Sequence, residues 1–166
     1  MRVFGFAGYS GSGKTTLIKQ LVSEFVAQGL RVSSIKFAHH DVDVDRPGKD
    51  SWQLREAGSD EVLLVSGKRW VLFHDAGPQA DLAYLFSRLA PCDLVLVEGC
   101  REQPLPKLEL WRNGIQGKLR WPDDPHVLGL VGPTLVAAEL PQFRPGQLVE
   151  IAAFVGQNAR KVDLCC

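Results

Sequence analysis

The feature that most constrains this sequence is a glycine-rich segment near its start, GYSGSGKTT at positions 8–16. The segment fits the phosphate-binding loop (P-loop) pattern, in which a glycine and four further residues are followed by Gly-Lys-Thr. A short apolar run at positions 3–7 precedes it, and apolar residues at helical spacing follow it from Leu17 to Val26. Strand, loop and helix in this order are the frame that the motif needs, so we predict a nucleoside triphosphate site.

The residue types of this segment suit a phosphate chain. Glycines at positions 8, 11 and 13 allow positive φ angles, which bring several backbone N–H groups against one anion. Lys14 is expected to reach the β and γ phosphates and to take part in catalysis, and Thr15 offers a hydroxyl to Mg²⁺. The N-terminus of the following helix adds its dipole. The predicted nucleotide-binding residues are Gly8, Ser10, Gly11, Ser12, Gly13, Lys14, Thr15 and Thr16.

Composition and charge narrow the functional classes. The 166 residues are 45% hydrophobic and 23% charged, which is typical of a single soluble domain over residues 1–166. Nineteen basic residues balance 19 acidic ones, so no global charge draws the chain to nucleic acid or to a membrane. The four cysteines show neither a zinc-site spacing nor a disulfide framework. We therefore expect a cytoplasmic protein.

The order of elements indicates an α/β fold of the P-loop NTPase type, with three layers and with helices on both faces of a mainly parallel sheet. The first strand, a helix over 14–28 that Gly29 ends, and a strand over 31–37 make a βαβ unit with a right-handed crossover. The further elements expected are a helix from an N-cap at Asp50 to Ala57, a hairpin of strands 61–66 and 69–74, a helix over 79–89, a strand over 126–131 and a helix around 148–155.

An acidic loop follows the second strand, where parallel α/β sheets bind their ligands. Asp41, Asp43 and Asp45 alternate as at the start of a calcium loop, but Arg46 stands at its glycine position and Trp52 at its glutamate position, which excludes calcium. Two interpretations stay open. The loop is a solvated connection, or it senses the nucleotide with Asp41 or Asp43 near Mg²⁺ or its water, as candidate catalytic residues.

A second carboxylate stands at the end of a buried strand. The apolar run at 94–97 is followed by Glu98 and Gly99, which has the shape of a Walker B segment. The usual acid is aspartate, whereas here Asp93 lies at the opposite end of the run. We assign Mg²⁺ or water coordination to Glu98, as a catalytic and metal-binding residue, against the alternative of a plain strand-terminal acid. Gly99 is expected to let the backbone approach the γ-phosphate.

The segment over residues 100–125 departs from this pattern. Prolines frame an alternating strand at 107–112, which meets Asn113-Gly114, a strong hairpin turn. We therefore expect a β-hairpin excursion from the sheet. Trp111 and Trp121 on exposed strands make it a candidate dimer or partner surface, although aromatic residues are more often core.

Four blocks in order carry a resemblance to a known family: GYSGSGKTT at 8–16, KFAHHDVDVDRPGKDS at 36–51, LREAG at 54–58 and LVEG at 96–99. With them the chain resembles the MobB family of molybdopterin-guanine dinucleotide biosynthesis adapter proteins. The resemblance implies a homodimer that binds GTP with Mg²⁺ and hydrolyses it weakly. It also implies a role in molybdenum cofactor biosynthesis beside a MobA-like molybdopterin guanylyltransferase.

A second class of function is a small-molecule kinase that passes the γ-phosphate to a metabolite. A kinase usually has an arginine-rich lid, and Arg101, Arg112 and Arg120 could form one, but no residue is identified as the acceptor's base. No assured arginine finger and no water-orienting glutamine is found, and such groups supply factors of roughly 10³ to 10⁵ in related systems. We therefore expect slow hydrolysis and favour the adapter.

Overall fold

The computed structural model describes residues 1–38, 44–74, 81–115 and 117–162. The chain divides into two compact units, which we describe separately: residues 1–37 with 89–166, and residues 38–88. Across the described ranges, no helix combines the length and apolar character needed to cross a membrane.

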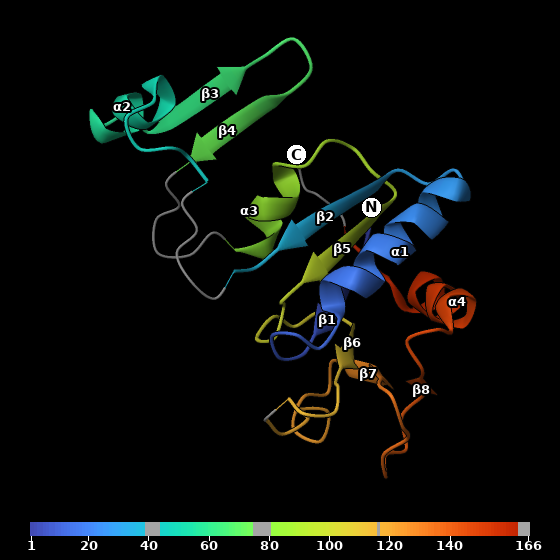
Figure 1. Ribbon diagram of the computed structural model, residues 1–166. Coiled ribbons are helices and arrows are strands. Elements are labelled where there is room, and N and C mark those ends of the chain that lie inside the picture. Colours follow the sequence, from blue (N-terminus) through green and yellow to red (C-terminus); the bar gives the residue numbers. More distant parts are fainter. Residues whose placement is uncertain (39–43, 75–80, 116, 163–166) are drawn as a thin grey trace. The chain divides into compact units, whose positions relative to one another are not determined.

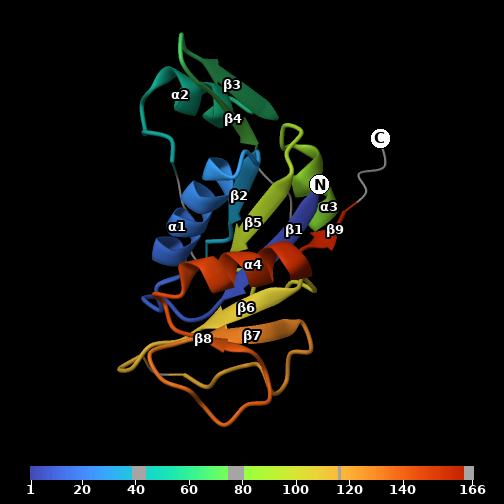
Figure 2. The same cartoon turned by 90° about the vertical axis from the view of Figure 1, so that its right-hand side faces the viewer.

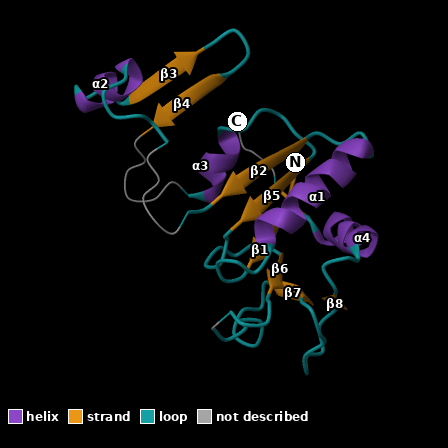
Figure 3. Ribbon diagram, in the orientation of Figure 1, coloured by secondary structure: helices purple, strands orange, loops and turns teal. Residues whose placement is uncertain are grey.

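The first unit is built on a mostly parallel sheet (Figures 1 and 3). The strand order is β2-β5-β1-β6-β7-β8, and each of these neighbours is parallel. A last strand, β9, runs antiparallel beside the start of β1, where β6 does not reach. The strands are β1 (Arg2–Ala7), β2 (Val32–Lys36), β5 (Leu94–Glu98), β6 (Lys107–Leu110), β7 (Val127–Val131), β8 (Gln142–Phe143) and β9 (Arg160–Lys161). The predicted parallel sheet is confirmed.

The core of this unit lies between the sheet and two helices, α1 (Lys14–Ala27) and α4 (Leu148–Asn158). Both helices pack on the same face of the sheet, as Figure 2 shows. Phe4 on β1 contacts the ring of Phe154 on α4 edge to face, with centroids 6.3 Å apart. In β5 the four residues before Glu98 are completely buried, which is typical of a central parallel strand.

Helix α1 ends where the sequence predicts. Gly29 has a φ of 83°, a left-handed conformation that glycine adopts without strain. The N–H of Leu30 donates to the carbonyl of Phe25 at 3.1 Å, and the N–H of Gly29 donates to Val26 at 2.9 Å. These two bonds form a Schellman motif, which closes the helix and returns the chain to β2.

The expected hairpin at Asn113-Gly114 is wrong. β6 is parallel to β1 on one side and to β7 on the other, so both of its edges are taken. Gly114 does form a turn, with a φ of 82°. Because all four residues of β6 are buried, the strand belongs to the main sheet and is no exposed excursion.

Polar and apolar residues alternate along β6, a pattern that predicts one solvent-exposed face, but the polar side chains of this strand are buried as well. Lys107 is 1% exposed and Glu109 is 2% exposed. The Lys107 ammonium donates to Asp124 Oδ2 at 2.9 Å and to the Gln103 carbonyl at 2.8 Å. Glu109 accepts the backbone N–H groups of residues 120 and 121 at 2.9 and 3.0 Å. The two side chains therefore fasten the connection between β6 and β7.

The second unit contains α2 (Asp50–Glu56), β3 (Glu61–Val65), β4 (Trp70–His74) and α3 (Leu82–Ser87). The predicted hairpin is confirmed, since β3 and β4 pair antiparallel with Leu63 opposite Leu72. The predicted N-cap of α2 is wrong by one position, because the cap is Lys49 and Asp50 is already helical. Gln53 Nε2 donates to the Gly48 carbonyl at 3.1 Å and so does not complete a capping box.

Helix α3 is shorter than the predicted span of 79–89. It starts after Asp81, whose carboxylate accepts the N–H of Tyr84 at 2.7 Å, and it ends at Ser87. Aspartate is a strong N-cap, because its carboxylate satisfies an unpaired N–H of the first turn. Residues 79 and 80 of the prediction lie outside the described residues.

Candidate functional site

The P-loop joins β1 to α1 and has the backbone that the sequence predicts. Its three glycines, Gly8, Gly11 and Gly13, have φ angles of 136°, 79° and 96°. A Cβ on Gly8 would lie 2.3 Å from the carbonyl oxygen of Leu110, so the loop also touches the end of β6. Gly13 is the N-cap of α1, so the N-terminus of this helix faces directly into the loop. Such a helix end favours an anion.

Lys14 lies folded across the loop. The residue is only 8% exposed, and its Nζ donates to the carbonyls of Gly8 and Tyr9, each at 2.8 Å. Burial lowers the pKa of Lys14; the negative charge of Glu98 opposes this change, and the positive charge of Lys36 adds to it. The ammonium thus lies within the loop, and its acceptors among the described residues are two uncharged carbonyls.

Glu98 and Thr15, predicted to share Mg²⁺, lie in contact. The Thr15 hydroxyl donates to Glu98 Oε1 at 2.7 Å. The register of the sheet explains this placement, because Glu98 ends β5 opposite Phe6 of β1, two residues before the loop starts. A hydroxyl and a carboxylate are the hard oxygen donors that Mg²⁺ prefers, so the donor set fits the ion.

Lys36 is a site residue that the P-loop and Walker B patterns do not include. It ends β2, which also pairs with β5, and its Nζ lies 3.7 Å from Glu98 Oε1. The available signal was its position as the last residue of a strand expected beside the P-loop strand. Gly99, with a φ of 78°, follows Glu98, and a Cβ there would lie 2.7 Å from the Phe37 carbonyl oxygen. That close approach explains the glycine without any ligand.

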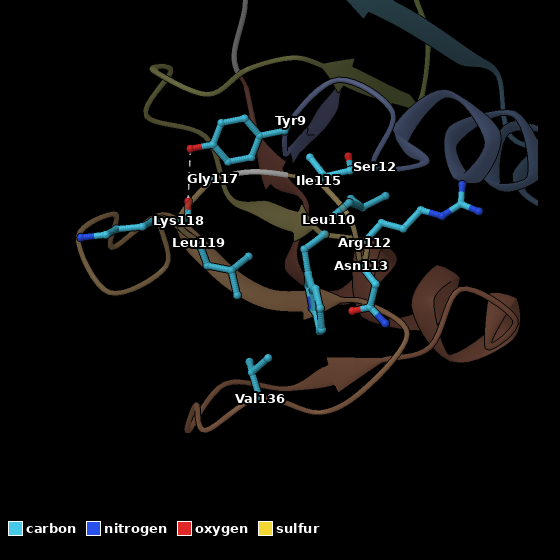
Figure 4. A pocket seen from close by; sticks show the side chains of 12 residues that line it. Tyr9, Ser12, Leu110, Arg112, Asn113, Ile115, Gly117, Lys118, Leu119 and Val136 are labelled. Atoms are coloured by element: carbon cyan, nitrogen blue, oxygen red, sulfur yellow. Dashed lines mark hydrogen bonds between the residues drawn. The ribbon is translucent and has the colours of Figure 1, made fainter.

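A cavity of about 470 Å³ opens beside the P-loop, toward the ends of β6 and β7 (Figure 4). A second cavity, of about 330 Å³, shares Ser12, Trp111 and Arg112 with it and extends to Pro133. Ser12 is 8% exposed, and within the described part of the chain its buried hydroxyl has no hydrogen-bond partner. An unpaired buried hydroxyl costs free energy unless a ligand or water completes it.

Tyr9 connects the P-loop to two other loops. The guanidinium of Arg101 lies over its ring, 4.6 Å from the centroid, and donates to its hydroxyl at 3.0 Å. The hydroxyl donates in turn to the carbonyl of Lys118 at 3.4 Å, the dashed line in Figure 4. A Cβ on Gly117 would lie 2.2 Å from the ring, so only glycine fits there. The backbone at Gly117 therefore packs tightly against the Tyr9 ring.

The three arginines considered for a kinase lid have separate surroundings. Arg101 stacks on Tyr9, and Arg120 pairs with Glu102 at 2.5 Å. Arg112 lines both cavities beside the P-loop. Two of the three are thus engaged by side chains of the protein itself.

The acidic loop after β2 is only partly described. Asp41 and Asp43 lie outside the described residues. Asp45 is 8% exposed and accepts the Ser51 hydroxyl at 2.9 Å and the N–H of Arg46 at 3.0 Å. Arg55 approaches the other carboxylate oxygen at 3.4 Å. Asp45 therefore fixes the approach to α2 in the second unit, and a purely solvated loop is wrong at this residue.

Known proteins of one description are similar to this chain in sequence. The sequence is 47% identical over 113 residues to the molybdopterin-guanine dinucleotide biosynthesis adapter protein of Haemophilus influenzae. The aligned residues cover 66% of this chain and 63% of that protein. It is also 43% identical over 116 residues to the Escherichia coli protein of the same description, and this alignment covers 68% of this chain and 66% of that protein. The match thus spans just under two thirds of the length of these curated relatives.

The fold is similar to that of Bacillus subtilis MobB, with a TM-score of 0.73 at 20% identity over 98% of this chain and 100% of that one. A crystal structure of molybdopterin-guanine biosynthesis protein B gives a TM-score of 0.72 at 24% identity, over 93% and 97% of the two chains. These likenesses confirm the predicted α/β fold. The family model described as molybdopterin guanine dinucleotide synthesis protein B matches residues 3–132, which include the P-loop, Lys36 and Glu98. The chain therefore belongs to the MobB family.

Proposed function

We propose that this protein binds GTP with Mg²⁺ at the P-loop, hydrolyses it slowly, and acts as an adapter in molybdopterin-guanine dinucleotide biosynthesis. The contact between Thr15 and Glu98 carries the proposal, because it brings a P-loop hydroxyl and a strand-end carboxylate to 2.7 Å. Membership of the MobB family and the adapter proteins among the relatives support the pathway.

Each residue of the site has a role in this proposal. Lys14 would exchange its carbonyl partners, Gly8 and Tyr9, for phosphate oxygens, which offer a charge that a carbonyl lacks. The N–H groups of the loop and of the start of α1 would hold the rest of the phosphate chain. Thr15 and Glu98 would hold Mg²⁺, which neutralises phosphate charge when bound. A catalytic role of Asp41 or Asp43, near the metal or its water, stays a prediction.

The cavities beside the P-loop offer space for the nucleoside. Their volumes, about 470 and 330 Å³, lie in the range of small-molecule sites. Trp111 and Pro133 give apolar walls, while Arg112 and the unpaired Ser12 hydroxyl give polar groups. Membership of the MobB family supports guanine as the proposed base.

Slow hydrolysis is supported by the engagement of the nearby arginines. Arg101 is held on Tyr9 and Arg120 on Glu102, so both guanidinium groups already have partners within the protein. An arginine finger supplies roughly 10³ to 10⁵ in rate where it acts. The same engagement weighs against a kinase lid, and the adapter proteins among the relatives favour the adapter.

We also propose that the protein is a cytoplasmic homodimer that meets a MobA-like guanylyltransferase. The free thiols of Cys92 and Cys100 suit a reducing compartment. Apolar side chains gather on one face of the β3–β4 hairpin, where Leu63, Val65 and Trp70 are 57%, 67% and 65% exposed. A lone two-stranded hairpin is marginally stable in water, so we assign this face to the second copy.

The test of nucleotide binding is a calorimetric titration of GTP at several Mg²⁺ concentrations. For Glu98→Gln we expect GTP to bind in the absence of Mg²⁺ as it does to wild type, and the gain from added Mg²⁺ to be largely lost. Asp93→Asn is the matched control, because Asp93 lies before the opposite end of the same strand and pairs with Arg31. Identical Mg²⁺ curves for wild type and Glu98→Gln would leave Glu98 a plain strand-end acid.

A further inference from the structure

Lys36 and Thr15 share one oxygen atom of Glu98. Lys36 and Glu98 are the last residues of β2 and β5 and pair in the sheet register. The Lys36 Nζ lies 3.7 Å from Glu98 Oε1, and the same oxygen accepts the Thr15 hydroxyl at 2.7 Å. The ammonium of Lys36 is therefore next to the first turn of α1, where the P-loop holds its ligand.

Among the described residues, the formal charges at this point do not cancel. Lys14 and Lys36 bring two positive charges to the single carboxylate of Glu98. The two lysines repel each other. Burial is the largest cause of the lowered pKa of Lys14, and the positive charge of Lys36 lowers that pKa further. The N-terminus of α1 adds a further partial positive charge. Like charges held together are unfavourable, so the arrangement favours a ligand with several negative charges.

The side chain of Lys36 is loosely held, whereas its backbone is fixed. The side chain is 64% exposed, against 13% for Glu98, and exposed ion pairs contribute little to stability. The N–H of Phe37 donates to the Glu98 carbonyl at 2.9 Å, and Gly99 packs closely on the Phe37 carbonyl. The ammonium can thus leave Glu98 without any movement of β2.

Resting on the nucleotide site proposed above, we propose that Lys36 is a second phosphate-binding lysine, which pairs with Glu98 in the ligand-free protein and with the terminal phosphate of a bound nucleoside triphosphate. A diphosphate lacks that group, so Lys36 separates triphosphate from diphosphate. Its departure also leaves Glu98 Oε1 to the Thr15 hydroxyl, and Glu98 would then be available to hold Mg²⁺. Lys36 is then the residue through which the protein distinguishes the nucleotide before hydrolysis from the product.

The experiment compares affinities for GTP and GDP by calorimetry, with Mg²⁺ and with a chelator, for wild type and Lys36→Gln. A charge-assisted hydrogen bond is typically strong enough for a change of about 10-fold, so we expect GTP with Mg²⁺ to bind about 10-fold more weakly to Lys36→Gln. GDP affinity should change by less than about twofold, because GDP has no γ-phosphate with which Lys36 could lose its contact. Lys36→Arg should restore most of the GTP affinity.

The matched control is Arg31→Gln. Arg31 precedes the other end of β2, is 67% exposed and pairs with Asp93 across the same two strands, so the variant makes the same charge change far from the P-loop. We expect wild-type affinities for both nucleotides. Thermal unfolding of both variants should match wild type, which separates a lost contact from a lost fold.

The outcomes distinguish this inference from the proposed function. A loss confined to GTP in Lys36→Gln supports it. Equal losses for GTP and GDP, or no loss for either, overturn the role of Lys36 while leaving nucleotide binding intact. A wild-type protein that binds neither nucleotide refutes the proposed function, and the role of Lys36 with it.

Discussion

Lys107 and Glu109 show how single buried charges shape this molecule. They are the two most buried charged residues among those described, at 1% and 2% exposure. Burial raises the pKa of the Glu109 carboxyl, while the N–H groups that it accepts act in the opposite direction. Each charge is thus tolerated because the connection between β6 and β7 completes its hydrogen bonds. These two residues therefore position the loop that lines the cavity beside the P-loop.

Glu109→Ala tests this positioning. We expect the free energy of unfolding to fall by about 1–3 kcal/mol, because the N–H groups of Arg120 and Trp121 lose their acceptor. Urea denaturation followed by circular dichroism measures the change. Glu139→Ala is the control, since Glu139 is exposed, and should stay within about 0.5 kcal/mol of wild type. Equal stability of the two variants would contradict the role of Glu109.

At the scale of elements, the P-loop depends on its neighbouring loops as well as on β1 and α1. Tyr9 carries the contact, because Arg101 covers one side of its ring and Gly117 fits beneath it. Movement of the P-loop on nucleotide binding would therefore reach the loops after β5 and β6. A partner protein could therefore recognise the nucleotide state through the conformation of those two loops.

Gly117→Ala and Gly114→Ala form a matched pair that tests this connection. Both glycines have positive φ angles, 142° and 82°, so both variants carry backbone strain of about 1–2 kcal/mol. Only at position 117 would the added Cβ meet the Tyr9 ring, at 2.2 Å, whereas nothing lies within 4 Å at 114. We expect GTP affinity, measured by calorimetry, to fall in Gly117→Ala alone. Equal affinities would mean that Tyr9 does not affect the P-loop.

The sequence predicted those elements whose signals are local. The P-loop glycines, the stop at Gly29 and the β3–β4 strands all follow from neighbouring residues, and the structure agrees. β6 was misjudged because alternation of polar and apolar residues indicates one solvent-exposed face, whereas the carboxylate that pairs with Lys107, that of Asp124, lies 17 residues along the chain. Lys36 was missed for a related reason, since its contact with Glu98 exists only once β2 and β5 are paired.

For the whole molecule, the exposed apolar face of the β3–β4 hairpin is the feature that a monomer does not explain. Leu63, Val65 and Trp70 share that face by register, and no charged residue separates them along either strand. Such a patch usually marks an interface. The adapter would then present its nucleotide sites in pairs.

Trp70→Lys tests the homodimer. We expect light scattering after size exclusion to give the mass of a dimer for wild type and of a monomer for the variant, because a lysine in the centre of an apolar interface loses its hydration. Val26→Lys is the control, because Val26 is also exposed, at 55%, but lies on α1 and outside the hairpin. Dimers in both variants would place the interface elsewhere, and a monomeric wild type would contradict the proposal.

The pairing of β1 has a consequence for how the chain folds. β1 is made first, yet its partners are β5, β6 and β9, with Arg2 opposite both Leu94 and Lys161. Such a high contact order slows folding, because long loops must close before β1 gains a neighbour. On the ribosome, the nascent P-loop therefore has no sheet beneath it until most of the chain has emerged, and nucleotide cannot guide the early steps of folding.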